Sequence, residues 1–171
     1  RVARHDPATG GVYDDFTNKT GAWTYNTGTF LGSAIELYDV TGESWYLEDA
    51  IRTADWTLEN LSVSAPSNKI LSDWAEQKDH DVNLFKGIFI RYFTRLIMHP
   101  DLPSDKKEKY VGFIEYNAKA LVTYATSTDD KSPILYNYGW YFKPENSFLR
   151  GQTSGCMLIE ALALLEKKGF L

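Results

Sequence analysis

The sequence predicts an all-α fold built from helical hairpins. Five stretches of the chain repeat their apolar residues at helical spacing, and none alternates convincingly as a β-strand does. Along the chain these stretches alternate between apolar on almost every side and amphipathic, an order that indicates inner helices followed by outer helices. The connections within each predicted pair are short, whereas those that lead into the apolar helices are long. The pattern therefore indicates a layered array of antiparallel hairpins.

The predicted inner helices are the first, third and fifth. The first is expected over residues 27–40, with Asn26 as its N-cap and Gly42 just after its end. The third contains "LFKGIFIRYFTRLIM" and is expected over residues 83–98, and the fifth contains "CMLIEALALL" and is expected over residues 153–168. Both are apolar almost all round, which predicts burial on most sides.

The predicted outer helices are the second and fourth. The second is expected over residues 43–61, where one apolar stripe faces a charged side. The fourth is expected over residues 105–125, after Pro103 and with Ser104 as its N-cap. Each outer helix therefore has one face for the core and one for water.

The long connections cover residues 1–25, 62–82 and 126–151, and an antiparallel array places all three at one end. Their aromatic residues are Trp23, Tyr25, Trp74, Tyr136, Tyr138, Trp140, Tyr141 and Phe142. Their carboxylates are Asp14, Asp15, Asp73, Glu76, Asp79, Asp81 and Glu145. Aromatic rings stack on the C–H faces of sugars while carboxylates and amides bind the hydroxyls, so this face suits a neutral polysaccharide. The alternative interpretation is that these aromatics only pack the loops against the helices.

The composition excludes several classes of function. The chain has 171 residues, enough for one domain, and a net charge of −5, which disfavours nucleic acid and anionic membranes as partners. No apolar run is long enough to span a membrane. Three widely spaced histidines and one cysteine give little support for a metal site, and we expect no cofactor. The first residues are neither a Met start nor a signal peptide, so we expect a processed, truncated or partial chain.

Two cations interrupt the apolar third helix. Lys86 and Arg91 lie where burial is predicted, and buried cations need partners. Asp81 and Glu76 lie just upstream and are the candidate partners. Either these ion pairs hold the preceding loop in place, or Lys86 donates to sugar hydroxyls or orients a catalytic acid.

Two residue pairs each have a structural and a functional interpretation. Gly28 and Gly32 are one turn apart on the first helix, where they allow either close helix packing or room for a substrate. Asp14 and Asp15 are adjacent, and either belong to a turn or act as general acid and nucleophile in glycoside cleavage.

The stretches "GGVYDD", "GAWTYNTGTFLGSAIELYDVTGESWYLEDA", "ILSDWAEQKDHD", "DVNLFKGIFIRYF" and "QTSGCMLIEALALL" carry a family likeness. They resemble segments of glycoside hydrolase family seventy-six, the endo-α-1,6-mannanases, over nearly the whole chain. The resemblance implies an (α/α)6 barrel, of which residues 1–171 are a single-domain, C-terminal part. It also implies substrate-cleft roles for Trp23, Tyr25, Asn26, Asp81, Phe85, Lys86 and Arg91. We add Trp140, from the loop aromatics, to this set of candidate substrate-binding residues. Thr27 departs from the family's Gln after WTYN, which removes one expected cleft hydrogen bond.

The family's catalytic pair is two adjacent aspartates upstream of the WTYN motif, in a segment that this chain lacks. The resemblance therefore implies an α-1,6-mannan hydrolase with a retaining mechanism whose isolated 171-residue part is inactive, with Asp14 and Asp15 only as fallback candidates. It implies an extracellular, cell-surface or periplasmic location. A second chain or a missing segment is expected to complete the barrel. The alternatives are a cell-wall mannan transglycosidase of the same family, a non-catalytic carbohydrate-binding helical module and, last, a helical-repeat interaction protein.

Overall fold

A computed structural model describes residues 4–64, 68–74, 76, 81–127, 134–143 and 148–171 of the chain. Helices make up most of it, as the sequence predicts. Their bounds, in chain order, are α1 (Thr24–Thr41), α2 (Ser44–Asn60), α3 (Val82–Ile97), α4 (Ser104–Tyr124) and α5 (Leu149–Lys167). None of these helices is long and apolar enough to cross a membrane.

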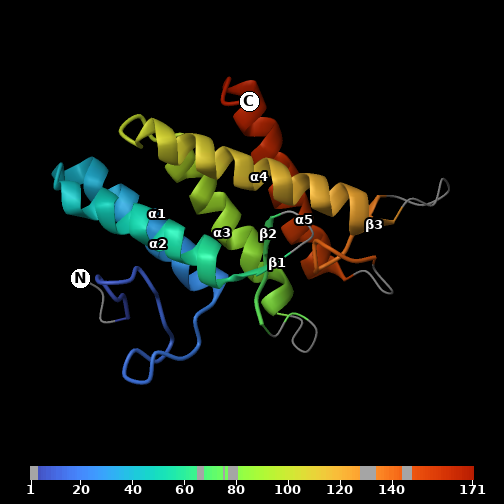
Figure 1. Cartoon of the computed structure of the whole chain (residues 1–171), viewed down its shortest axis with the longest axis horizontal. Helices are drawn as coiled ribbons and strands as arrows, with labels where there is room; N and C mark the ends of the chain where they lie inside the picture. The colour runs from blue at the N-terminus through green and yellow to red at the C-terminus, as the bar shows by residue number, and fades with distance from the viewer. Residues whose placement is uncertain (1–3, 65–67, 75, 77–80, 128–133, 144–147) are drawn as a thin grey trace.

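The helices form two layers (Figure 1). The inner layer is a row in which α3 packs between α1 and α5. In the outer layer, α2 packs on α1, while α4 lies across α5 and α3. The first, third and fifth helices are therefore inner and the other two outer, which confirms the order predicted from apolar periodicity.

The core lies between the layers. Its fully buried side chains include Leu31 and Ile35 of α1, Phe89 and Phe93 of α3, and Tyr110 of α4. Phe93 contacts Phe89 and Tyr110 with ring centroids 5.0 and 4.9 Å apart, so aromatic packing joins the inner layer to α4.

Close approach of the inner helices depends on glycine. A Cβ atom on Gly28 of α1 would lie 2.6 Å from the Cα atom of Phe89 on α3. A Cβ atom on Gly87 of α3 would lie 2.7 Å from the sulfur of Met157 and 3.1 Å from the Cα atom of Ser154, both on α5. The structural interpretation of the glycine pair is therefore right for Gly28, which sets the spacing of α1 and α3.

The sequence missed two short hairpins within the long connections. β1 (Ser62–Ser64) pairs antiparallel with β2 (Lys69–Leu71), and β3 (Thr126–Ser127) pairs antiparallel with β4 (Leu135–Tyr136). Strands of two or three residues are too short for alternation to be recognised, so the expectation of no strand was wrong here.

The helix starts also differ from those predicted, by one residue for α2, α3 and α4 and by three or four residues for α1 and α5. α1 begins at Thr24 with Trp23 as its N-cap, so Asn26 lies inside the first turn instead of capping it. α4 begins at Ser104, and its N-cap is Pro103. α5 begins at Leu149, four residues before the predicted start. The predicted end of the first helix is confirmed, because Gly42 adopts the left-handed conformation with φ of 70° and its N–H donates to the Tyr38 carbonyl.

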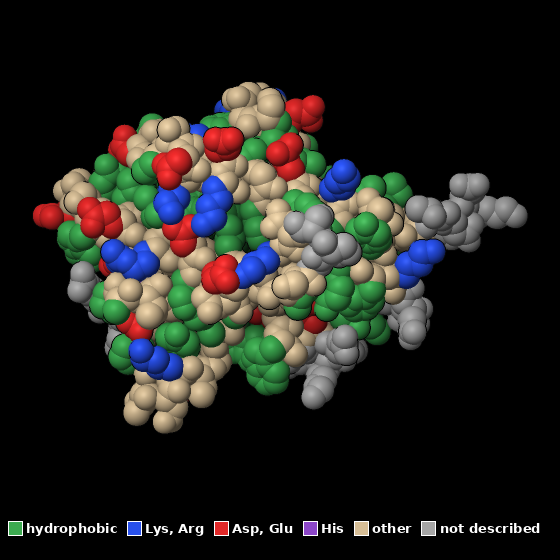
Figure 2. All heavy atoms as spheres, viewed as in Figure 1, with side chains coloured by type: hydrophobic (Ala, Val, Ile, Leu, Met, Phe, Trp, Pro, Cys, Tyr) green, Lys and Arg blue, Asp and Glu red, His purple; other side chains and the backbone are tan. Residues whose placement is uncertain are grey.

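Acidic and basic side chains are interspersed on the face shown in Figure 2, with no basic patch on that face. Some of these charges link the outer helices. Asp55 of α2 accepts from Lys106 and Lys109 of α4 at 2.6 and 2.7 Å. Such partly exposed pairs contribute at most about 1 kcal/mol each, so the core and not the surface charge holds the layers together.

Replacing Gly28 by Ala is expected to lower the free energy of unfolding by about 1–3 kcal/mol, because the new methyl group would press against the α3 backbone. Gly112→Ala is the matched control. A Cβ atom there would meet nothing within 4 Å, and alanine in a helix is favoured over glycine by up to about 1 kcal/mol. Urea denaturation of both variants measures the difference. Equal effects at the two positions would contradict the close-packing account.

Candidate functional site

The described parts of the three long connections meet at the N-terminal ends of the inner helices (Figure 1). Residues of the N-terminal loop bond to the first turn of α1, residues between α2 and α3 bond to Thr24, and residues between α4 and α5 bond to Lys86. The prediction of one elaborated face is therefore confirmed for the described residues.

Asp14 is the centre of hydrogen bonding at the start of α1. Its Oδ2 atom accepts from Trp23 Nε1 at 3.0 Å, and its Oδ1 atom accepts from Asn26 Nδ2 at 2.9 Å and Tyr25 OH at 3.3 Å. Arg4 Nη1 lies 3.8 Å from Oδ1. One carboxylate therefore orients three of the four side chains of the WTYN motif, those of Trp23, Tyr25 and Asn26.

A tight turn of the N-terminal loop brings Asp14 to this position. Asp15 and Thr20 pair through both backbone N–H groups, and the Asp15 carboxylate accepts from the backbone N–H and the side chain of Asn18. Gly21 follows with φ of +68°, a conformation that suits glycine, and its carbonyl accepts from the Asp14 N–H at 3.1 Å. The hydrogen bonds from Asn18 lower the pKa of Asp15, which therefore stabilises the turn as a carboxylate.

Four aromatic rings form a row beside Asp14. Trp74 stacks on Trp23 with centroids 4.9 Å apart and an interplanar angle of 25°. Trp23 meets Phe85 of α3 edge-on at 5.8 Å, and Phe85 contacts Tyr25 at 4.4 Å. Trp74 is 74% exposed, so the row has an open end. These rings, together with the polar groups at the start of α1, form the mouth cluster: Asp14, Trp23, Tyr25, Asn26, Trp74 and Phe85.

The structure thus brings together four of the residues predicted to bind substrate, namely Trp23, Tyr25, Asn26 and Phe85. Trp74 was not among the predicted site residues. The sequence contains one indication of a binding role for Trp74, namely that it is one of the aromatic residues of the long loops. Its contact with Trp23 follows only from the fold.

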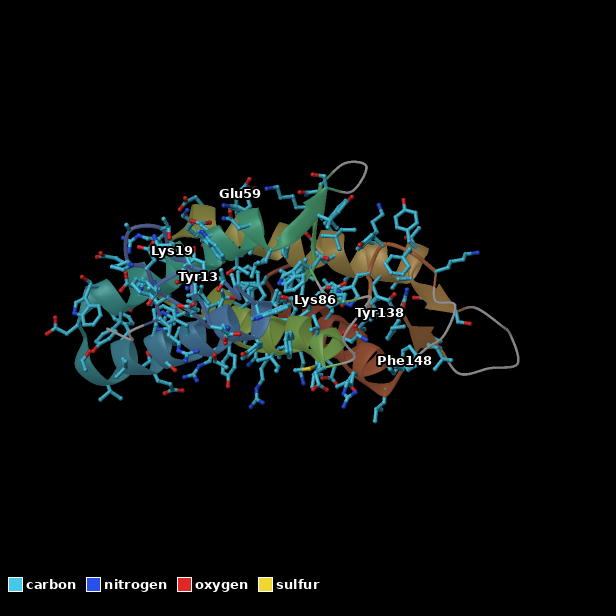
Figure 3. All side chains as sticks on the ribbon, turned by 90° about the horizontal axis from the view of Figure 1, so that it is seen from below. Tyr13, Lys19, Glu59, Lys86, Tyr138 and Phe148 are labelled. Atoms are coloured by element: carbon cyan, nitrogen blue, oxygen red, sulfur yellow. The ribbon has the colours of Figure 1, made fainter. Side chains whose placement is uncertain are left out.

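A buried ion pair lies behind the mouth cluster. Lys86 Nζ lies 2.8 Å from Glu76 Oε1, donates to the Tyr138 carbonyl at 2.5 Å and lies 4.5 Å from the centre of the Trp140 ring. Figure 3 shows Lys86 and Tyr138 close together within the fold. Glu76 is therefore confirmed as a partner of Lys86. Through these contacts Lys86 joins α3 to the connection before it and to the connection between α4 and α5.

The same network caps α1. Glu76 Oε1 accepts from the Asp73 N–H at 2.7 Å, and the Asp73 carboxylate accepts from the Thr24 N–H at 2.9 Å and from Thr24 Oγ1 at 2.6 Å. An acceptor 49 residues away in sequence thus satisfies a first-turn N–H of α1.

Burial dominates the electrostatics of this network. It raises the pKa of Asp73 to about 6, although the hydrogen bonds from Thr24 oppose the shift. Burial also raises the pKa of Glu76, although Lys86 opposes that shift. Removal from water disfavours the charged carboxylates more than their partners stabilise them.

Four of the predicted substrate-binding residues lie apart from the mouth cluster or behind it. Lys86 and Trp140 are both 0% exposed, so neither presents surface to a sugar in this structure. Arg91 was expected to be buried but is exposed, and it lines a groove with side chains of α5 away from the mouth cluster. Asp81, the N-cap of α3, pairs with Arg150 of α5, with Oδ1 and Nη2 3.0 Å apart, while Lys86 pairs with Glu76.

The two fallback carboxylates have separate partners. Asp15 accepts within its own turn, while Asp14 accepts from the WTYN side chains. Asp79 and Glu145, also expected on this face, lie outside the described residues. Within the described part of the chain, no cluster of three or more His, Cys, Asp or Glu side chains could hold a metal ion.

The geometry can be compared with known proteins. A family model described as glycosyl hydrolase family 76 matches residues 3–171. The chain belongs to glycosyl hydrolase family 76. Among curated proteins, none matches significantly.

Two solved structures have a similar fold. The GH76A alpha-1,6-mannanase from Salegentibacter sp. HEL1_6 is 34% identical, with a TM-score of 0.79 over 95% of this chain and 48% of its own. The Lin0763 protein from Listeria innocua is 31% identical, with a TM-score of 0.76 over 94% of this chain and 44% of its own. The chain thus spans less than half the length of either structure, and its helices form part of the family's α/α barrel.

Two further structures are inactive variants of the Salegentibacter mannanase, each altered at two adjacent aspartates. Their names describe complexes with α-1,6-mannotetrose and α-1,6-mannotriose. Family 76 therefore includes an enzyme inactivated by aspartate replacement and crystallised with α-1,6-linked mannose oligomers.

Asp73 is expected to weaken the fold as the pH rises from about 4 to about 6. Its pKa is about 6 in the folded protein against 3.8 ordinarily, so over this range the unfolded chain releases the proton first and gains stability. The Asp73→Asn variant has no carboxyl group at this position, so it does not lose stability in this way as the pH rises. Relative to the wild type, its free energy of unfolding should rise between pH 4 and pH 7 by on the order of 3 kcal/mol.

Urea denaturation across this pH range measures the difference. Asp15→Asn is the control of opposite sign, because the pKa of Asp15 is lowered and its carboxylate adds stability as the pH rises. Parallel pH profiles for the wild type and Asp73→Asn would rule out a buried carboxyl of raised pKa.

Proposed function

We propose that this chain supplies one side of the substrate cleft of a glycoside hydrolase that acts on α-1,6-linked mannan. The observation that carries the proposal is the mouth cluster, in which Asp14 orients Trp23, Tyr25 and Asn26 beside the exposed ring of Trp74. The family membership and the mannose oligomers named in the Salegentibacter complexes support it.

The chemistry of the mouth cluster suits a neutral sugar. Trp74 offers an open aromatic face, and such faces stack on the C–H surface of a pyranose ring. Asn26 and Asp14 supply amide and carboxylate groups that bind hydroxyls, and the 43% exposed Asp14 side chain leaves lone pairs accessible. Because these groups already bond to one another, little ordering cost remains when a sugar binds.

We propose further that the catalytic carboxylates lie outside this chain. Retaining cleavage needs two carboxyl groups flanking the scissile bond, one as nucleophile and one as acid and base. Asp14 and Asp15 are instead used in orienting the WTYN side chains and in the loop turn. The chain also matches less than half the length of the Salegentibacter enzyme.

An additional segment, or a second chain, is proposed to complete the barrel. The open side of the first hairpin has an apolar pocket of about 260 Å³. Its lining includes Phe30, Ala34, Leu37, Trp45 and Tyr46. Leu37 is 44% exposed there, and on the other open side Leu149 is 82% exposed. Exposed apolar side chains at both ends of the inner row suit further helices packed against them. We propose that the protein acts outside the cell or at its surface, as the family resemblance implies.

A non-catalytic carbohydrate-binding module is the second candidate. The observation that favours it is the engagement of both adjacent aspartates in structural hydrogen bonds. It predicts sugar binding without turnover in any longer form of the protein.

Trp23→Ala is expected to weaken binding of α-1,6-mannotetraose at least tenfold, about 1.4 kcal/mol, because it removes a ring of the aromatic row and a partner of Asp14. Isothermal titration calorimetry measures the dissociation constant. Trp45→Ala is the matched control, since Trp45 lies at the start of α2, at the opposite end of the hairpin. Equal affinities for the wild type and Trp23→Ala, with circular dichroism showing both folded, would overturn the proposed cleft.

The 171-residue chain by itself is expected to release no reducing ends from α-1,6-mannan, because Asp14 and Asp15 are engaged in structural hydrogen bonds and the catalytic carboxylates are proposed to lie outside it. A reducing-sugar assay on linear mannan measures this. Turnover lost on Asp15→Asn would place catalysis in this chain and contradict the proposal. Product analysis of any longer active form separates hydrolysis from transfer to a second mannan chain.

A further inference from the structure

A groove lies beside the mouth cluster, on the side of the N-terminal loop and the C-terminal end of α2. Its volume is about 520 Å³, within the range of about 300–1,000 Å³ typical of small-ligand sites. It is lined by Tyr13, Thr20, Gly21, Ala22, Trp56, Asn60, Leu61, Ser62, Val63, Ser72 and Trp74. Figure 3 shows Tyr13 on the N-terminal loop, alongside the helices.

None of the described residues that line this groove is charged, although 24% of the chain is. By contrast, the groove between α2 and α4 is lined by several charged side chains, among them Asp55, Glu59 and Lys109. An ionic ligand would therefore find no opposite charge among the described lining residues. The lining suits a neutral ligand.

The walls combine aromatic rings with hydroxyl and amide groups. Tyr13 and Trp56 meet edge-on with centroids 5.7 Å apart, and Trp74 forms an exposed wall. Asn60 and Ser62 each donate to a backbone carbonyl of α2 and retain oxygen atoms that can accept. Alternating apolar rings and hydrogen-bonding groups match the two kinds of surface on a pyranose sugar.

Trp74 connects the groove to the mouth cluster. It stacks on Trp23 in the mouth cluster and also lines the groove. A polymer that crosses the mouth cluster can therefore continue past Trp74 without leaving an aromatic surface. The adjacent Asp73 bonds to the first turn of α1, which joins the backbone beside Trp74 to that helix.

We propose that this groove is a second saccharide-binding site, which holds mannose units of an α-mannan chain beyond Trp74. The site extends the polysaccharide contact from the inner helices to the C-terminal end of α2. That the sugar is mannose rests on the proposed function, whereas the preference for a neutral saccharide rests on the lining alone.

Fluorine NMR of protein labelled with 5-fluorotryptophan tests the two sites separately. The chain has five tryptophans: Trp23 reports on the mouth cluster, Trp56 on the groove, Trp74 on both, and Trp45 and Trp140 serve as internal controls. Titration with α-1,6-mannotetraose should shift the Trp56 resonance in a saturable way and leave Trp45 and Trp140 in place. Asn60→Ala should raise the concentration for half-maximal Trp56 shift at least fivefold, whereas Asn68→Ala, on the groove between α2 and α4, should not.

The Trp23 and Trp56 resonances distinguish a failure of the groove from a failure of the proposed cleft at the mouth cluster. A shift of Trp23 with no shift of Trp56 would overturn the groove and leave the proposed cleft standing. A shift of Trp56 alone would support the groove and count against the cleft, and no shift at either would overturn both. With Asn26→Ala, which weakens the mouth cluster, the Trp56 response should persist. Its disappearance in that variant would mean that the signal is relayed from the mouth, and would overturn the second site.

Discussion

The buried ion pair between Lys86 and Glu76 is the interaction on which the site depends. An ammonium group without exposed surface is costly to remove from water, and it is tolerated only where its hydrogen bonds and charge are matched. Here Glu76 supplies a partner from the connection before α3, and the Tyr138 carbonyl and the Trp140 ring supply partners from the connection between α4 and α5. Loss of one partner would leave a buried charge, at a cost of about 3–5 kcal/mol. Two long connections are therefore fastened to α3 at one point.

The position of the aromatic row follows from this constraint. Glu76 holds the backbone of Asp73, Asp73 caps α1 through Thr24, and the next residue along the chain is Trp74. Trp74 in turn stacks on Trp23. Rings that would otherwise move with long loops are thereby held in a fixed relation to the inner helices. A binding surface ordered in advance loses less entropy when it meets a ligand.

Asp14 provides a second, independent anchor from the N-terminal loop. It is partly exposed and accepts from three side chains of the WTYN motif, whereas the Lys86 network is sealed behind them. The mouth cluster thus has a buried support on one side and a solvent-facing support on the other. This division explains how acidic residues at the same end of the fold have different tasks. Asp73 and Glu76 fix the backbone, and Asp14 orients the surface that a sugar would meet.

The sequence by itself determined the helices, their layers and the end of the fold at which the long loops gather. These features depend on local periodicity and on loop length, which are properties of neighbouring residues. The resemblance of the WTYN and FKGIF motifs to those of family 76 also placed Trp23, Tyr25, Asn26 and Phe85 in one cleft.

Only the tertiary structure decided which polar residues are buried. Lys86 and Arg91 look alike in the apolar sequence of α3. Lys86 is buried against two long connections, whereas Arg91 is exposed and lines a groove with side chains of α5. The cap of α1 comes from Asp73, far along the chain, and the groove beside Trp74 is assembled from three separate segments. Burial and such long-range contacts arise from how the hairpins pack together, and no local pattern of residues encodes them.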